Sequence, residues 1–97
     1  MGTQFGLRIK ELRERQGLLQ RQVAALLEID TPLYSKIERG ERIAKKEVAG
    51  RLASILMADE KQLLTLWLAD QVYDVVKDEL QAGDALKTVS KKLKGKI

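Results

Sequence analysis

The chain has 97 residues and a net charge of +4, and 44% of its residues are hydrophobic and 33% are charged. A chain of this length forms one domain with at most an extension, and its composition favours a folded helical protein over a disordered one. The sequence contains no Cys and no His, which excludes disulfides, thiolate nucleophiles, imidazole bases and the usual zinc and haem ligands. We therefore expect no enzyme activity, no catalytic residue, no cofactor and no metal site.

The charge is unevenly distributed along the chain. Residues 1–57 hold 11 basic and 7 acidic side chains, residues 58–81 hold 2 and 6, and residues 82–97 hold 5 and 1. A basic front, an acidic middle and a basic tail indicate an anionic partner for the front, although three ordinary solvated surfaces would give the same counts.

Apolar periodicity predicts helices from the N-terminus onward. Phe5, Ile9 and Leu12 repeat at i, i+4 and i+7, which predicts a helix over residues 3–16 that Thr3 caps and Gly17 ends. A second helix is expected over residues 20–27.

A third helix is predicted to follow after a three-residue turn, residues 28–30. Asp30 is a natural N-cap, Pro32 is tolerated in the first turn, and Gly40 follows the last helical residue, Arg39. Two helices joined by such a turn form a helix-turn-helix.

The remaining chain is also predicted to be helical. A fourth helix is expected over residues 45–56, and a longer fifth helix from Asp59 to about residue 81, with Gly83 as its break and Asp84 as the cap of a last short helix. No run is apolar enough to span a membrane, and the N-terminus has no signal-peptide core. The predicted fold class is all-α.

The third helix has two distinct faces on a helical wheel. Its apolar face carries Leu33, Tyr34 and Ile37, so Tyr34 is expected to pack inward rather than to contact nucleic acid. The opposite side presents short hydroxyls, a flat ring and two cations: Thr31, Pro32, Ser35, Lys36 and Arg39. Such a side suits a DNA major groove, where small residues approach base edges and Lys reaches guanine O6 or N7.

The stretch GLLQRQVAALLEIDTPLYSKIERGER resembles the Cro/cI-type helix-turn-helix of the XRE family, and the resemblance covers about residues 5–66. It implies a five-helix lambda-repressor-like domain over residues 1–66, with residues 67–97 as a C-terminal helical extension. It also implies a cytoplasmic, nucleoid-associated bacterial or phage protein that regulates transcription by binding double-stranded DNA as a homodimer. The simplest mechanism for such a protein is repression by blocking polymerase.

The resemblance assigns roles to individual positions. The base-facing positions are Thr31, Pro32, Ser35 and Lys36. The phosphate-contacting positions are Gln20, Arg39, Arg42, Lys45 and Lys46. Arg13 and Glu38 match a pair that forms a buried ion pair in the family.

Three positions depart from the family pattern. Glu28 stands where Gly is usual in the turn, so it is expected to adopt a left-handed backbone at a cost of about 1 kcal/mol. Leu19 replaces a Ser cap, and the Pro that often follows the third helix is absent. With Thr31 and Pro32 in place of longer polar side chains, phosphate contacts and DNA shape are expected to carry much of the specificity.

The fifth helix continues an apolar row beyond what a domain of this kind can cover. The expected dimer surface is Trp67, Leu68, Val72, Val75 and Val76. The same row could instead be covered by the last helix or hold another protein, as in an antitoxin or a restriction–modification controller protein.

Overall fold

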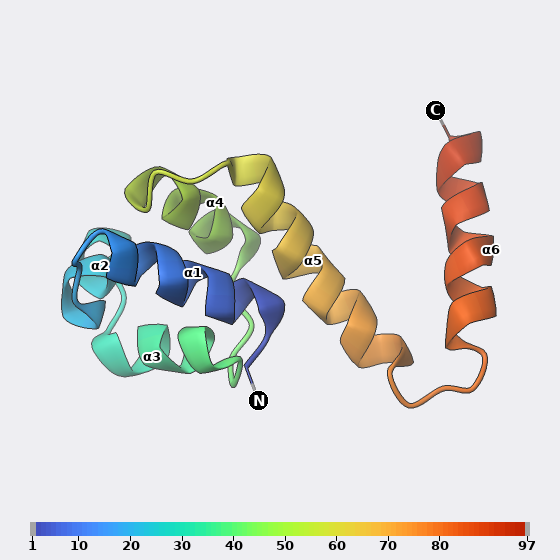
Figure 1. Cartoon of the computed structure of the whole chain (residues 1–97), viewed down its shortest axis with the longest axis horizontal. Helices are drawn as coiled ribbons and strands as arrows, with labels where there is room; N and C mark the ends of the chain where they lie inside the picture. Colours follow the sequence, from blue (N-terminus) through green and yellow to red (C-terminus); the bar gives the residue numbers. More distant parts are fainter. Residues whose placement is uncertain (1, 97) are drawn as a thin grey trace.

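The computed structural model describes residues 2–96, and this part of the chain folds into six α-helices without a strand (Figure 1). The helices are α1 (Gln4–Arg15), α2 (Gln20–Leu27), α3 (Thr31–Arg39), α4 (Lys46–Ile55), α5 (Glu60–Val76) and α6 (Ala82–Gly95). The all-α prediction is confirmed, and α1 to α4 lie within a residue or so of their predicted positions. None of these helices is both long and apolar enough to cross a bilayer.

One hydrophobic core lies between α1, α2, α3, α4 and the N-terminal half of α5. In this unit α1 packs on α3 and α5, α2 packs on α3 and α4, and α4 packs on α5. The buried apolar residues are Phe5, Ile9, Leu12, Val23, Ala24, Leu27, Tyr34, Ile37, Ala44, Ala49, Leu52, Ala53, Leu56 and Leu63. We call this unit, residues 2–67, the helical domain.

Local capping explains where the first helices begin and end. The Thr3 hydroxyl accepts a hydrogen bond from the Gly6 amide at 2.9 Å, and the Asp30 carboxylate accepts one from the Leu33 amide at 2.7 Å. Gly40 follows α3 with φ of +77°, a conformation that glycine adopts without steric cost. The caps were predicted from residue type and spacing, and the structure confirms them.

The close approach of α1 to α3 requires glycine at position 6. A Cβ atom at Gly6 would lie only 2.3 Å from the Glu38 carbonyl oxygen, which is far inside a van der Waals contact. The two helices can therefore pack with their backbones in near contact, and this fixes the position of α3 against the core.

α5 has apolar residues on two opposite sides. Leu63 is fully buried against the helical domain, and Leu66 and Trp67 pack against the core on the same side. Farther along this side, the Asp70 carboxylate accepts hydrogen bonds from the Gln4 and Phe5 amides at 3.1 and 2.9 Å. Asp70 thus caps the N-terminus of α1 and joins α5 to it.

The C-terminal part of the chain differs from the prediction. α5 ends at Val76 rather than near residue 81, and nothing in the local sequence of residues 77–81 explains the turn that follows. Gly83 and Asp84 were expected to break one helix and to cap the next, but both lie in the first turn of α6. An early glycine costs a helix little, and a carboxylate in the first turn interacts favourably with the helix dipole.

α6 stands apart from the rest of the molecule (Figure 1). None of its residues is buried, and the radius of gyration is 15.1 Å, compared with about 12.5 Å for a compact chain of this length. We call the second half of α5, from Leu68, together with the following turn and α6 the C-terminal arm, residues 68–96.

Candidate nucleic-acid interface

The turn between α2 and α3 is held by backbone geometry and by one arginine. Glu28 has φ of 60° and ψ of 39°, so the prediction of a left-handed conformation at this residue is confirmed. Arg51 of α4 donates hydrogen bonds to the Leu26 and Leu27 carbonyls at 2.7 and 3.3 Å. These carbonyls lie at the end of α2, where no amide of the helix pairs with them. Arg51 therefore joins α4 to the C-terminal end of α2, just before the turn.

The two sides of α3 differ sharply in exposure. Tyr34, Ile37 and Glu38 are buried, and Leu33 is half-buried. The opposite side is open to solvent at Pro32, Lys36 and Arg39, and partly open at Thr31 and Ser35. All four residues expected to face bases therefore have exposed surface on the same side of one rigid helix.

A buried ion pair holds α3 against α1. Arg13 Nε lies 2.6 Å from Glu38 Oε2, and Arg13 Nη2 donates to Glu38 Oε1 at 3.1 Å. The remaining arm of the guanidinium donates to the Leu18 carbonyl at 2.8 Å, at the entrance to α2. The pair that the resemblance implied is present as a bidentate contact, and it joins α1, α3 and the start of α2.

The pKa values around this pair favour its charged form. Burial raises the pKa of Glu38, but the hydrogen bonds that Glu38 accepts from Arg13 and Gln20 outweigh burial, so the net pKa shift is downward. The hydrogen bond to Glu38 raises the pKa of Arg13, and burial raises the pKa of Tyr34. Both partners therefore stay charged and Tyr34 stays neutral at physiological pH.

The sequence of this region matches a known family. The model of a helix-turn-helix domain, of the Cro/cI-like type, matches residues 4–66. The chain belongs to this helix-turn-helix family. Comparison with curated proteins found no significant match, and comparison with solved structures found none either. Family membership supports DNA binding and a role in transcription regulation, and the family is typically non-enzymatic.

The Gln20 side chain, which was expected to contact a phosphate, is hydrogen-bonded to the buried ion pair instead. Its amide nitrogen donates to Glu38 Oε1 at 3.0 Å, so the side chain turns inward toward the ion pair. The N-cap of α2, Leu19, makes no side-chain cap. The backbone N–H groups at the start of α2, rather than the Gln20 amide, are thus the groups available to an anion there.

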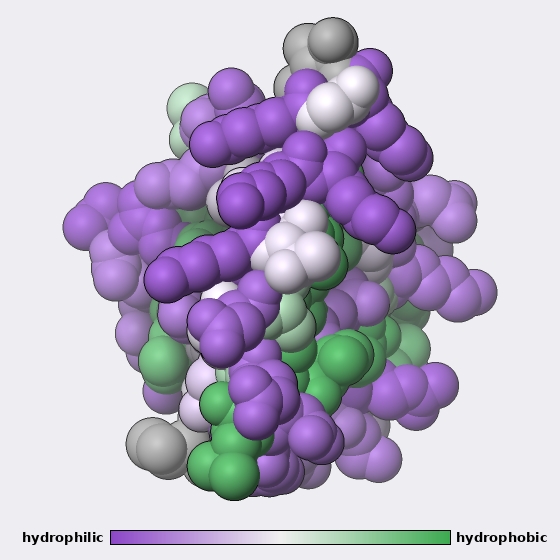
Figure 2. All heavy atoms as spheres, turned by 90° about the vertical axis from the view of Figure 1, so that its right-hand side faces the viewer, coloured by the Kyte–Doolittle hydropathy of each residue, from purple (hydrophilic) through white to green (hydrophobic). Residues whose placement is uncertain are grey.

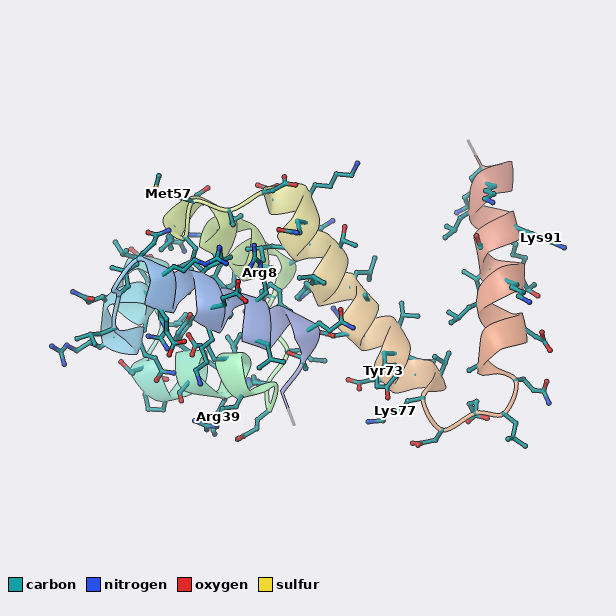
Figure 3. All side chains as sticks on the ribbon, viewed as in Figure 1. Arg8, Arg39, Met57, Tyr73, Lys77 and Lys91 are labelled. Carbon is teal, nitrogen blue, oxygen red and sulfur yellow. The ribbon has the colours of Figure 1, made fainter. Side chains whose placement is uncertain are left out.

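Arg39 is at the exposed end of α3 and points away from the core (Figure 3). Its Nε lies 2.7 Å from Glu41 Oε2, and Nη1 donates to the Ser35 hydroxyl. The hydrogen bond to Glu41 raises the pKa of Arg39, and the same contact lowers the pKa of Glu41. Glu41 occupies the guanidinium that would bind a phosphate, and this contact makes Glu41 a functional candidate. The sequence analysis missed it.

The loop after α3 supplies further cations. Arg42, Lys45 and Lys46 are all exposed, and Lys45 is the N-cap of α4 without a side-chain cap. Free amides at a helix start and adjacent lysines both attract phosphate. The helix-turn-helix and this loop together place positive groups around the exposed side of α3.

Trp67 does not lie with the other residues of the expected dimer surface. Its indole N–H donates to the Ala44 carbonyl at 2.7 Å, and its ring is half-buried against the core of the helix-turn-helix domain. Leu68, Val72 and Val75 are exposed and Val76 is half-buried. Trp67 differs from these residues because its position on α5 faces the domain, on a different side of the helix from Val72.

Proposed function

We propose that this chain is a sequence-specific transcriptional regulator that inserts α3 into the DNA major groove and acts as a homodimer. We place the helix-turn-helix domain at residues 1–66, in the five-helix lambda-repressor-like arrangement, and the dimerising extension at residues 67–97. The observation that carries the proposal is the exposed row on α3, which lies opposite a buried face in a family of DNA-binding domains.

In this proposal the contacts divide between bases and phosphates. Lys36 donates to guanine O6 or N7, while Thr31, Pro32 and Ser35 approach the base edges closely because they are small. Arg39, Arg42, Lys45 and Lys46, with the start of α2, hold the DNA backbone on either side of α3. Since only Lys36 is a long base-facing donor, DNA shape contributes the rest of the specificity.

Repression by blocking polymerase is the mechanism we propose, because it requires only that the chain occupy its DNA site. Pairing two domains about 34 Å apart on two half-sites would raise both affinity and specificity. The alternative is an antitoxin or a restriction–modification controller-type protein in which the C-terminal helix holds another protein. The exposed apolar side of the C-terminal arm is what keeps this alternative open.

A binding titration tests the proposal. DNA from upstream of the chain's own gene is compared with scrambled DNA of equal composition at two salt concentrations, since phosphate contacts alone are salt-dependent and sequence-blind. Preference for the native fragment at the higher salt is expected. Equal affinity for both fragments at both salts would contradict sequence-specific regulation.

Lys36→Ala provides the residue-level test. We expect it to lower affinity for the preferred fragment by about 1–3 kcal/mol and to leave affinity for scrambled DNA almost unchanged. Lys61→Ala, on α5, is the matched control because it removes the same charge from an exposed site outside α3. If Lys36→Ala distinguished the preferred fragment from scrambled DNA as well as the unmodified chain does, Lys36 would not contact a base.

A further inference from the structure

The C-terminal arm carries an apolar groove that its own chain leaves open. The groove has a volume of about 490 Å³ and is lined by Thr65, Leu68, Ala69, Val72, Tyr73, Val76 and Leu86. All of these residues except Leu86 belong to α5, on the side opposite Leu63 and Trp67. α6 of the same chain therefore reaches the groove at one residue only and does not fill it.

α6 has an apolar stripe of its own that is also uncovered. Leu86, Val89 and Leu93 repeat at i, i+3 and i+7, and they are 43%, 51% and 57% exposed. Lys91 points from the opposite side of α6, away from α5 (Figure 3). The outward side of α6 is largely hydrophilic (Figure 2). The stripe thus faces the space between α6 and α5, but α5 lies too far away to bury it.

The two apolar stripes match in length and spacing. Leu68 to Val76 rises by about 12 Å along α5, and Leu86 to Leu93 rises by about 10 Å along α6. Apolar residues at intervals of three and four are the pattern with which helices pack side by side. Each stripe is therefore suited to cover a helix that carries the other stripe.

The charges of the two segments are complementary. Residues 58–81 carry a net charge of −4, and residues 82–97 carry +4. Lys87 and Lys94 flank the α6 stripe on one side, and Lys92 and Lys96 flank it on the other. Residues 58–81 and 82–97 together carry no net charge, so α5 and α6 of two copies can approach without net repulsion, whereas residues 1–57 keep a net charge of +4.

We propose that the groove on α5 is the docking site for α6 of a second copy of this chain, and that the two copies exchange α6 reciprocally. The arms then form a four-helix bundle in which each α6 lies between α5 and α6 of the other copy. This inference rests on the homodimer of the proposed function and specifies its contact. It assigns the interface to α5 and α6 together, with Trp67 outside it.

Two matched variants test the exchange. Val72→Asp places a carboxylate in the groove, and Val89→Asp places one on the α6 stripe without touching the groove of its own chain. Sedimentation equilibrium without DNA measures the self-association of each full-length variant. We expect a dimer for the unmodified chain and self-association weakened by more than about tenfold in each variant.

Mixing the two variants gives the decisive result. A heterodimer keeps one intact contact, between α6 of the Val72→Asp chain and α5 of the Val89→Asp chain. The mixture is therefore expected to associate more strongly than either variant alone. A mixture no stronger than the separate variants would overturn the exchange, as would a monomeric unmodified chain or a Val89→Asp variant that dimerises normally.

The control is Thr88→Asp, which adds the same charge next to Val89 on the opposite side of α6 and should leave association unchanged. Circular dichroism checks the helicity of all variants, and α6 buries no residue whose loss would unfold the domain. Binding of Val89→Asp to a single half-site duplex is expected at unmodified affinity. Failure of the DNA experiment with an intact exchange would reject the regulator proposal alone.

Discussion

The helical domain and the C-terminal arm contain similar apolar residues, but these residues are buried in the domain and exposed in the arm. In the domain, leucine and valine side chains meet those of other helices, and Val23, Leu52 and Leu63 are fully buried. In the arm, the same residue types remain exposed, with Val75 at 77% and Leu93 at 57%. Amphipathic patterning therefore specifies a helix in both regions, but only the domain contains all the surfaces needed to cover its apolar faces.

This difference means that the domain stabilises the fold, whereas the arm leaves an apolar surface for assembly. The domain is held by its core, by the Arg13–Glu38 ion pair and by the contact of Asp70 with α1. The arm adds almost nothing to the burial of that core. Substitutions in the domain should accordingly change unfolding, and substitutions on the exposed apolar side of the arm should change association.

The largest effect is expected for Glu38→Ala. This substitution leaves the Arg13 guanidinium buried without its carboxylate, so the free energy of unfolding should fall by about 3–5 kcal/mol. Thermal and urea denaturation measure the loss. Glu41→Ala is the control, because Glu41 makes a similar ion pair with Arg39 in full exposure to solvent, and its stability should stay close to that of the unmodified chain.

The same carboxylate makes stability depend on pH. Because the pKa of Glu38 is lowered in the folded state, its contribution is present above its ordinary pKa and is lost as pH falls through the lowered value. Glu38→Gln should remove this part of the acid dependence. An unchanged acid-unfolding profile in Glu38→Gln, or a melting temperature of Glu38→Ala near that of the unmodified chain, would exclude the pair as a major source of stability.

Two leucine substitutions compare the regions directly. Leu63→Ala removes a fully buried side chain from α5 and should cost about 2–5 kcal/mol of unfolding free energy. Leu86→Ala removes a side chain that is 43% exposed, and it should change the stability of the monomer by no more than about 0.5 kcal/mol. Both are measured in dilute solution, where association does not contribute. Similar losses for both variants would mean that α6 belongs to the domain core.

Asp70→Ala tests the contact at the border between the two regions. It removes the acceptor of two amide hydrogen bonds at the N-terminus of α1, and we expect a loss of about 0.5–2 kcal/mol, as for other N-terminal caps. Asp74→Ala, one turn farther along α5, is the control because Asp74 pairs only with Lys77 at 3.5 Å in an exposed contact. Equal stability of the two variants would contradict the capping role.

Asp70 also marks the limit of what the sequence could predict. Helices α1 to α4 and their caps follow from local patterns, since Thr3, Asp30 and Gly40 act within a few residues of their own positions. The contact of Asp70 with Gln4 joins residues 66 positions apart, so it depends on how α5 crosses α1. No local pattern in the sequence around Asp70 therefore indicates this contact.

The same reasoning applies to the candidate interface and to the arm. The faces of α3 could be predicted from helical phase alone, and the Arg13–Glu38 pair from the family pattern. The inward turn of Gln20, the contact of Arg51 with the end of α2 and the contact of Trp67 with Ala44 all need a neighbouring helix in place. The separation of α6 from α5 likewise depends on residues 77–81, which contain no local signal for a turn.

The smallest effect we predict is a gain of DNA affinity in Glu41→Gln. In the free protein the Glu41 carboxylate occupies the Arg39 guanidinium, so a phosphate must displace it before Arg39 can bind. Glutamine removes the competing charge, so affinity for both specific and scrambled DNA should rise severalfold. The slope of log affinity against log salt concentration should become steeper by about one unit, because one more phosphate is neutralised. Glu79→Gln, which makes the same charge change in the C-terminal arm, should leave affinity almost unchanged. If the two variants gained affinity equally, the effect would come from net charge alone, and Glu41 would not be a competitor at the DNA-binding surface.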